Sequence, residues 1–244
     1  MSSEKEILLY EHNGSTIAHY AASESKNPFA SSGIEITMHE LSSGIIGSTI
    51  SSSSPSSRIG FSGQLGIIDF TTSTRLPRHV HISSTSLPAG TTSDDVETQS
   101  THHLTSERIL VLNGVALVEL NGDIYVIPPK TLVHIAAGVP HTWTACPRGI
   151  QFSDAMKENG SFTAGNSIKE TESPISDGTF LMVYMYEDVT GFFPTEQTET
   201  IEDVNKYVRC DDLERIRFPQ LSVEDVYEKA WFIYGTEVWK CGPR

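Results

Sequence analysis

Three histidines and one glutamate form the most informative pattern in this chain: His79 and His81, then Glu107, then His141. Three imidazoles and one carboxylate can surround a divalent metal ion and leave coordination positions open for a ligand. The apolar-flanked stretch that holds His79 and His81 is typical of a strand, in which residues i and i+2 point to the same face. Both imidazoles can therefore enter one cavity.

The donor types indicate which metals would suit such a site. Neutral imidazole and carboxylate fit divalent iron, manganese, nickel, copper or zinc, and the absence of cysteine argues against a closed structural zinc site. We expect iron, because an open His/Glu site is well suited to dioxygen. Glu107 could also leave the metal transiently and act as a base. Taken singly, each of these residues is more often an ordinary core or surface side chain.

Two further residues are candidates for catalysis. Arg75 precedes the histidine pair and could bind an anionic or phenolate substrate, although a solvated surface charge is the plainer interpretation. His134 precedes His141 and could line the cavity as an acid–base group, with a hydrogen-bonded barrel histidine as the equal alternative. Trp143 could form a wall of the cavity, but core packing is favoured.

Short apolar runs separated by turn residues position these side chains. Asn113-Gly114 and Asn121-Gly122 each lie between such runs, and Asn-Gly is the strongest short hairpin signal because both central residues of a type I′ turn need positive φ. We therefore expect an antiparallel meander over residues 107–127. The same alternation predicts further strands at residues 6–10, 33–38, 63–70, 132–135 and 180–186. Such short strands predict a mainly β fold, a sandwich or small barrel.

The pattern changes after residue 190. Residues 200–208 and 222–239 resemble helices, the second with Ser222 as its N-cap and acidic residues in its first turn. We expect residues 1–190 to form the β domain and residues 191–244 to form a helical extension packed on its outside.

The order of these residues resembles the cupin superfamily, whose members are antiparallel jelly-roll barrels. A first cupin motif carries a His-x-His pair, a Glu and a Gly, and a second has a Gly-x-x-His core. Here Glu107 precedes Gly114 at the family's spacing, and Gly138-Val139-Pro140-His141 is similar to the second motif. The resemblance covers roughly residues 63–146 and is to the single-domain, metal-dependent, quercetinase-like type. It implies that the three histidines and the glutamate are the metal ligands.

Two departures from the family pattern stand out. Residues 82–106 separate the histidine pair from Glu107, where the family has only a few residues, and this Ser/Thr-rich segment is expected to be an inserted loop. Ala136, Lys130 and Ala145 replace residues that often shape turns in the second motif. None of these replacements removes a ligand.

His102 and His103 offer an alternative ligand, because both lie close before Glu107. The first histidine of that uninterrupted motif would then fall on a serine or threonine, which leaves the site one ligand short. We therefore favour His79 and His81, and we expect His102 and His103 to lie on a lid loop.

Composition excludes several classes of protein. The chain has 244 residues, 17 basic and 31 acidic, for a formal net charge of −14, which argues against binding nucleic acid or anionic membranes. The N-terminus lacks the pattern of a signal peptide, no apolar run is long enough to cross a bilayer, and the three cysteines are far apart. We expect a soluble cytoplasmic protein.

The resemblance implies a metal-dependent enzyme that acts on a small, aromatic or enolisable metabolite. An oxygenase of the dioxygenase type is the leading hypothesis. A non-redox cyclase, isomerase or decarboxylase is the alternative, and a metal-free small-molecule-binding cupin is a further one. Residues 115–120 and 124–127 are apolar on nearly both faces, so helices or a second subunit must cover them. We expect a homodimer.

Overall fold

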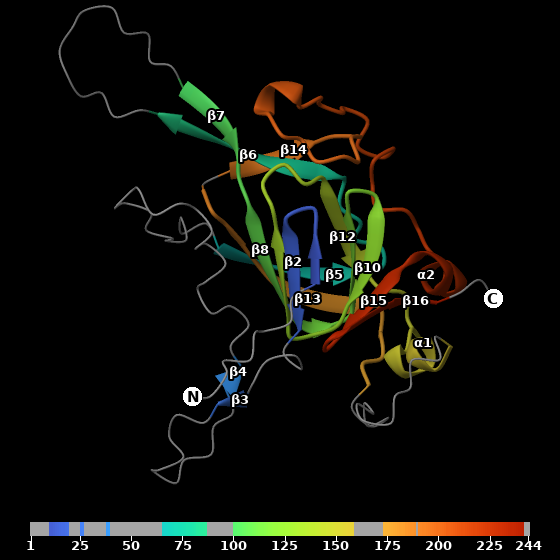
Figure 1. The fold of residues 1–244 in the computed structure, drawn as a ribbon. Helices are drawn as coiled ribbons and strands as arrows, with labels where there is room; N and C mark the ends of the chain where they lie inside the picture. The colour runs from blue at the N-terminus through green and yellow to red at the C-terminus, as the bar shows by residue number, and fades with distance from the viewer. Residues whose placement is uncertain are drawn as a thin grey trace, which may run out of the picture.

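Two large β-sheets dominate the computed structural model, which describes residues 10–19, 25–26, 38–39, 65–86, 100–158, 173–188 and 190–241 (Figure 1). The six-stranded sheet has the order β1 (Tyr10–His12), β2 (Ser15–His19), β11 (Thr131–Ile135), β8 (Glu107–Gly114), β13 (Thr179–Tyr186), β5 (Leu65–Thr71). The eight-stranded sheet has the order β14 (Thr190–Pro194), β6 (His79–Ser86), β12 (His141–Ala145), β9 (Ala116–Leu120), β10 (Asp123–Ile127), β15 (Trp231–Tyr234), β16 (Glu237–Lys240), with β7 (Ser100–Leu104) also paired to β6. The short strands β3 (Ser25–Lys26) and β4 (Met38–His39) pair separately.

Alternate side chains from both sheets fill the space between them. Ile109 and Val111 of β8 are fully buried, and so are Val118 and Leu120 of β9 in the facing sheet. Trp143 of β12 belongs to the same core cluster. This period of two is what a strand with one face on the core requires. The expected mainly β fold is confirmed.

Of the two Asn-Gly turns, one closes a hairpin and the other connects the two sheets. Asn121 (φ 50°) and Gly122 (φ 85°) join the antiparallel pair β9–β10, as predicted for a tight hairpin. At the first turn only Gly114 has positive φ, at 66°, and the chain passes there from β8 in one sheet to β9 in the other. The predicted meander is therefore wrong at this turn. The pairing partners of β8 are β11 and β13, which are distant in sequence.

The segment at residues 82–106 is not a simple inserted loop. Strand β6 continues to Ser86 and pairs antiparallel with β7, so the ends of the segment extend the sheet. Runs of serine and threonine can form strands once a neighbouring backbone supplies the hydrogen bonds, and threonine favours them. Residues 87–99 lie outside the described residues.

The helical extension predicted after residue 190 is largely wrong. Within residues 200–208 the structure has only a short 3₁₀ helix, η4 (Val204–Lys206), and within 222–239 only α2 (Val223–Lys229) is helical. Ser222 caps α2 as predicted, in a capping box with Asp225. Strands β14, β15 and β16 all follow residue 189 and belong to the eight-stranded sheet. The open edge of β10 accepts β15 in parallel, so tertiary hydrogen bonding outweighs the local helical pattern.

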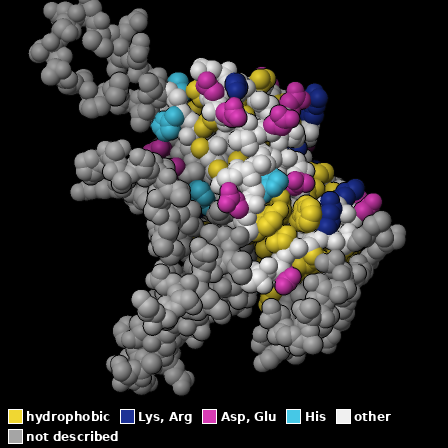
Figure 2. Space-filling model, viewed as in Figure 1, with side chains coloured by type: hydrophobic (Ala, Val, Ile, Leu, Met, Phe, Trp, Pro, Cys, Tyr) yellow, Lys and Arg dark blue, Asp and Glu magenta, His cyan; other side chains and the backbone are white. Residues whose placement is uncertain are grey.

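The outer face of the eight-stranded sheet is covered by the chain itself. Leu117 and Val126 pack there against Phe152 of α1 (Phe152–Glu158) and against Val226 of α2. This cover removes the reason for which the sequence favoured a second subunit. Figure 2 shows a smaller area of hydrophobic side chains on the surface over β10 and β15. On β15, the ring centre of the half-buried Trp231 lies 5.4 Å from the Lys240 ammonium.

Among the described residues, no helix is both long enough and apolar enough to span a bilayer.

Candidate metal centre

The proposed ligands come together from both sheets at one end of the core. His79 and His81 lie on β6, and His79 is directly opposite His141 of β12 in the antiparallel register. Glu107 begins β8 in the facing sheet and, like Ile109 and Val111, points inward. All four side chains are buried, with exposed fractions of 1–4%. Long-range strand pairing therefore brings residues from three separate segments to one place.

The distances within this cluster are short. One ring nitrogen from each of His79, His81 and His141 lies within 4.8 Å of the other two. The Glu107 Oε2 atom is 3.1 Å from Nε2 of His141 and 3.4 Å from Nε2 of His81. The cluster therefore has the size and donor types of a site for one metal ion.

The backbone sets which nitrogen of each ring faces the cluster. Each Nδ1 lies near a main-chain carbonyl: His79 at 2.8 Å from Pro77, His81 at 3.0 Å from Gly191, and His141 at 2.8 Å from Val139. A carbonyl oxygen only accepts, so each Nδ1 carries a hydrogen and donates it. In the neutral ring, Nε2 then carries no hydrogen. This tautomer can donate the Nε2 lone pair to a metal ion.

When these rings are neutral, three acceptor atoms converge without a donor to join them. Nε2 of His81, Nε2 of His141 and Oε2 of Glu107 are buried and have no hydrogen-bond partner among the described residues. Lone pairs that face one another in a buried site repel, and unpaired buried polar atoms are costly. A metal cation would remove both penalties, so the residues present fit a metal ion.

Burial and neighbouring groups shift the pKa values of His79 and Glu107. Burial, followed by the neighbouring His141 and His81, lowers the pKa of His79 well below its ordinary value, so this ring stays neutral. For Glu107 burial raises the pKa, but the contacts with His81 and His141 outweigh burial and leave the net pKa below the usual range. The Glu107 carboxylate is therefore ionised, the form that can bind a metal ion or accept a proton.

Two aromatic residues that the sequence analysis missed form walls of the site. The ring centre of Tyr186 lies 4.4 Å from that of His81, and Phe192 lies 4.4 Å from His79. Tyr186 is directly opposite Glu107 in the β8–β13 register, and alternation along the expected strand 180–186 could have placed it inside. Phe192 had no such signal, because residues after 190 were expected to be helical. Phe192 is 46% exposed, so this wall of the site reaches the protein surface.

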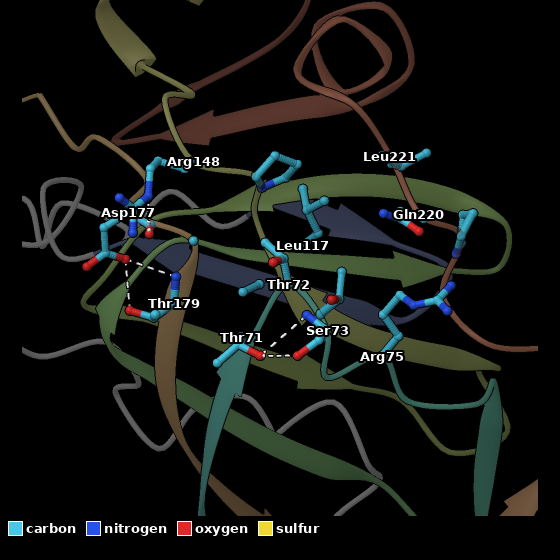
Figure 3. A pocket seen from close by; sticks show the side chains of 15 residues that line it. Thr71, Thr72, Ser73, Arg75, Leu117, Arg148, Asp177, Thr179, Gln220 and Leu221 are labelled. Carbon is cyan, nitrogen blue, oxygen red and sulfur yellow. Dashed lines mark hydrogen bonds between the residues drawn. The ribbon is translucent and has the colours of Figure 1, made fainter.

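His134 and Arg75 do not join the cluster. His134 pairs with Arg108 in the β8–β11 register, whereas its neighbour Ile135 pairs with Glu107, so His134 lies on the opposite face of the sheet. Arg75 donates to the carbonyl of Phe218 at 2.9 Å and lines a different pocket (Figure 3). The sequence suggested both from proximity along the chain, which strand alternation and the loop path override.

His102 and His103 also lie away from the cluster. Both are on β7, where His103 pairs with Ser83 in the register and its Nε2 lies 2.9 Å from Asp188 Oδ2. The structure thus places His79 and His81, rather than these two residues, beside Glu107.

Comparisons with known proteins gave matches among solved structures alone. No model of a protein family matches the chain, and no curated protein matches it. A dTDP-4-dehydrorhamnose 3,5-epimerase from Elizabethkingia anophelis is 8% identical, with 75% of each chain covered and a TM-score of 0.40. The polyketide cyclase RemF from Streptomyces resistomycificus is 13% identical over 62% of this chain and 72% of its own, with a TM-score of 0.27.

A third structure similar to the chain is ChmJ, a 3′-monoepimerase from Streptomyces bikiniensis in complex with dTDP-quinovose. It is 10% identical, with 69% of each chain covered and a TM-score of 0.29. Overlap at this level is too weak to assign a family or an activity, so the functional argument depends on the site itself.

Proposed function

We propose that this protein is a metal-dependent enzyme of the cupin type that acts on a small organic metabolite. The observation that carries the proposal is the convergence of His79, His81 and His141 on the ionised Glu107, with each Nδ1 held by a backbone carbonyl. Donors oriented in this way favour metal binding over an ordinary polar core. Iron is the expected ion, with manganese, nickel, copper or zinc as alternatives.

A bound metal would supply Lewis-acid activation of a substrate oxygen, and iron would in addition permit dioxygen chemistry. The chain's own residues supply the other functions. The rings of Tyr186 and the half-exposed Phe192 pack at a tilt against the histidines, and they suit a flat, aromatic or enolisable substrate that enters past Phe192. Burial, followed by the nearby Glu107, raises the pKa of Tyr186, so this phenol keeps its proton beside the substrate.

We favour proton transfer without redox change, as in an isomerase or cyclase, over the oxygenase that the sequence suggested. Glu107 accepts a substrate proton at Oε2, and the proton returns to another atom of the same substrate. These residues account for such a reaction without an additional co-substrate. Oxygen transfer would in addition require dioxygen as a co-substrate.

Metal analysis of the purified protein tests the proposal. We expect close to one transition-metal ion per chain in the wild type, loss of that ion in His79→Ala, and its retention in the control His103→Ala, whose ring contacts Asp188 instead. A wild-type protein that binds no transition metal after incubation with iron, manganese, nickel, copper or zinc would instead support a metal-free binding protein.

Oxygen uptake then divides the reaction classes. With enolisable and phenolic compounds offered to the metal-loaded enzyme, we expect solvent deuterium to enter the substrate without oxygen consumption. Stoichiometric oxygen consumption would restore the oxygenase hypothesis. Glu107→Gln with full metal occupancy and full turnover would exclude Glu107 as the base.

A further inference from the structure

A second pocket, of about 690 Å³, lies on the outer face of the eight-stranded sheet (Figure 3). This volume falls within the ~300–1,000 Å³ range of small-molecule sites. Leu117 and Thr144 form part of its wall and are directly opposite one another in the β9–β12 register. Leu117 packs in the outer hydrophobic cluster, whereas Trp143 packs in the core between the sheets. The pocket and the histidine cluster therefore lie on opposite faces of the sheet.

The wall that carries Arg75 is held in place by the backbone. Thr144 Oγ1 donates to the carbonyl of Thr74 at 3.0 Å, and the Phe218 amide donates to Leu76 at 3.0 Å. Arg75 Nη1 in turn donates to the carbonyl of Phe218 at 2.9 Å. These bonds tie the segment after β5 to β12 and to the segment before α2, so the guanidinium is positioned before any ligand binds.

The opposite wall holds a second cation. Arg148 Nε donates to the carbonyl of Asp177 at 3.1 Å. The Asp177 carboxylate is occupied by Thr179, whose amide and hydroxyl donate to Oδ1 at 2.9 and 2.8 Å. Among the described residues, neither Arg75 nor Arg148 is within ion-pair distance of a carboxylate. Both guanidiniums keep donors for an anion, in a chain whose net charge is −14.

Hydroxyl groups lie between the two cations. Figure 3 shows Arg75 and Arg148 on opposite sides of the pocket, with Thr71, Thr72 and Ser73 between them. The hydroxyls of Thr71 and Ser73 lie 2.7 Å apart, so each can also donate to or accept from a ligand hydroxyl. Guanidinium binds phosphate with charge-assisted, paired hydrogen bonds, and hydroxyls match the hydroxyls of a sugar.

We propose that this pocket binds a phosphorylated, hydroxyl-bearing metabolite of the sugar phosphate class, at a site separate from the histidine cluster. The phosphate lies at the Arg75 guanidinium, the hydroxylated part contacts Thr71 and Ser73, and the Arg148 guanidinium on the opposite wall donates to the far hydroxyls. The buried Leu117 forms part of the wall behind it. The proposal stands independently of the reaction proposed for the histidine cluster.

Calorimetric titration of the full-length protein with ribose 5-phosphate, and separately with inorganic phosphate, tests this site. We expect saturable binding of ribose 5-phosphate, weakened about tenfold or more in Arg75→Gln and in Arg148→Gln, because each removes a charge-assisted contact. The control Arg209→Gln, at an exposed arginine paired with Asp211, should bind like the wild type. Inorganic phosphate should bind more weakly than the sugar phosphate, since it leaves the hydroxyls unused.

Further outcomes decide against the proposal. His141→Ala should bind ribose 5-phosphate normally, and loss of binding there would place the phosphate at the histidine cluster instead. Equal affinity in wild type and Arg148→Gln, or no saturable binding to the wild type, would also overturn it. If Arg75→Gln unfolds because its bond to Phe218 is lost, Arg148→Gln alone gives the answer, since its main-chain contact is at an exposed turn.

Discussion

Glu107 and Glu119 are two buried carboxylates with opposite surroundings. Each is 4% exposed, Glu107 on the inner face of one sheet and Glu119 on the outer face of the other. Arg78 contacts Glu119 Oε1 through Nε at 2.7 Å and Nη2 at 2.6 Å, so this carboxylate has a complete cationic partner. Glu107 contacts His81 and His141, whose inward nitrogens are acceptors in the neutral rings.

The difference separates a structural carboxylate from a candidate functional one. A buried ion pair that is complete within the chain needs nothing further. A buried carboxylate among lone pairs needs a cation that the chain does not supply. Burial alone therefore does not distinguish the two roles, but the donor inventory around each carboxylate does.

The largest expected effect is loss of metal from the Glu107 site. His141→Ala should weaken metal binding by more than about 100-fold, because losing even an outer hydrogen-bond partner of a ligand costs about 10–100-fold. Competition against a chromogenic chelator measures this. Glu119→Gln is the matched control and should bind metal like the wild type. An equal loss of metal affinity in His141→Ala and Glu119→Gln would show that the surroundings of Glu107 are not specific for a metal ion.

The free energy of unfolding should depend more on Glu119 than on Glu107, the reverse of what is expected for metal binding. Glu119→Gln should lower the free energy of unfolding by about 3 kcal/mol, since it leaves the mostly buried Arg78 charge without a partner. Urea unfolding of chelator-treated protein measures this value. A change below about 0.5 kcal/mol would mean that the Arg78–Glu119 pair behaves like an exposed surface pair.

His19 extends the comparison to a buried group with a backbone partner. Burial lowers its pKa from 6.5 to about 4, and Lys130 adds to this, although a backbone hydrogen bond to Pro129 opposes it. The Gly235 amide donates to His19 Nδ1 at 2.9 Å, which protonation of that nitrogen would break. Since the folded-state pKa is the lower one, this stability is present above pH 6.5 and is lost as the pH falls towards 4.

The expected loss for His19 is about 2 kcal/mol across this window, a value reduced for partial screening. The difference between the unfolding free energies at pH 7 and pH 4.5 should be smaller in His19→Gln than in the wild type. The His141→Ala background removes the metal site from the measurement. An unchanged pH dependence would show that the His19 contact with the C-terminal hairpin contributes nothing.

The smallest effect is expected for Glu107→Gln without metal. Removing this charge removes both its cost of burial and its attraction to His81 and His141, which oppose each other, so the free energy of unfolding should stay within about 1 kcal/mol of the wild type. Chelator-treated samples of both proteins give the comparison. A loss as large as that in Glu119→Gln would indicate that protonated histidines pair with Glu107 and that no metal is needed.

Local signals were reliable where one segment contains the whole interaction. Asn121-Gly122 forms the predicted hairpin because both residues adopt the positive φ that the turn needs. Ser222 caps α2 because the capping box involves only the first turn. Asn113-Gly114 has the same letters, but β8 is paired on both edges by β11 and β13, so the chain must leave that sheet.

Residues 231–240 show the limit of helical patterns. Trp231, Phe232 and Ile233 fit either a short amphipathic helix or a strand, and the free edge of β10 decides for the strand. The same limit explains Phe192, which reaches the site through pairing of β14 with β6.

The candidate donors of the metal centre can be identified without the structure, because His79 and His81 share a face on any strand and Glu107 and His141 follow in order. The residues that accompany them are set by the fold. Strand pairing brought in Tyr186 and Phe192, alternation turned His134 to the opposite face, and the loop before β6 carried Arg75 to the second pocket. Such contacts depend on register between distant strands, which local residue preferences do not encode.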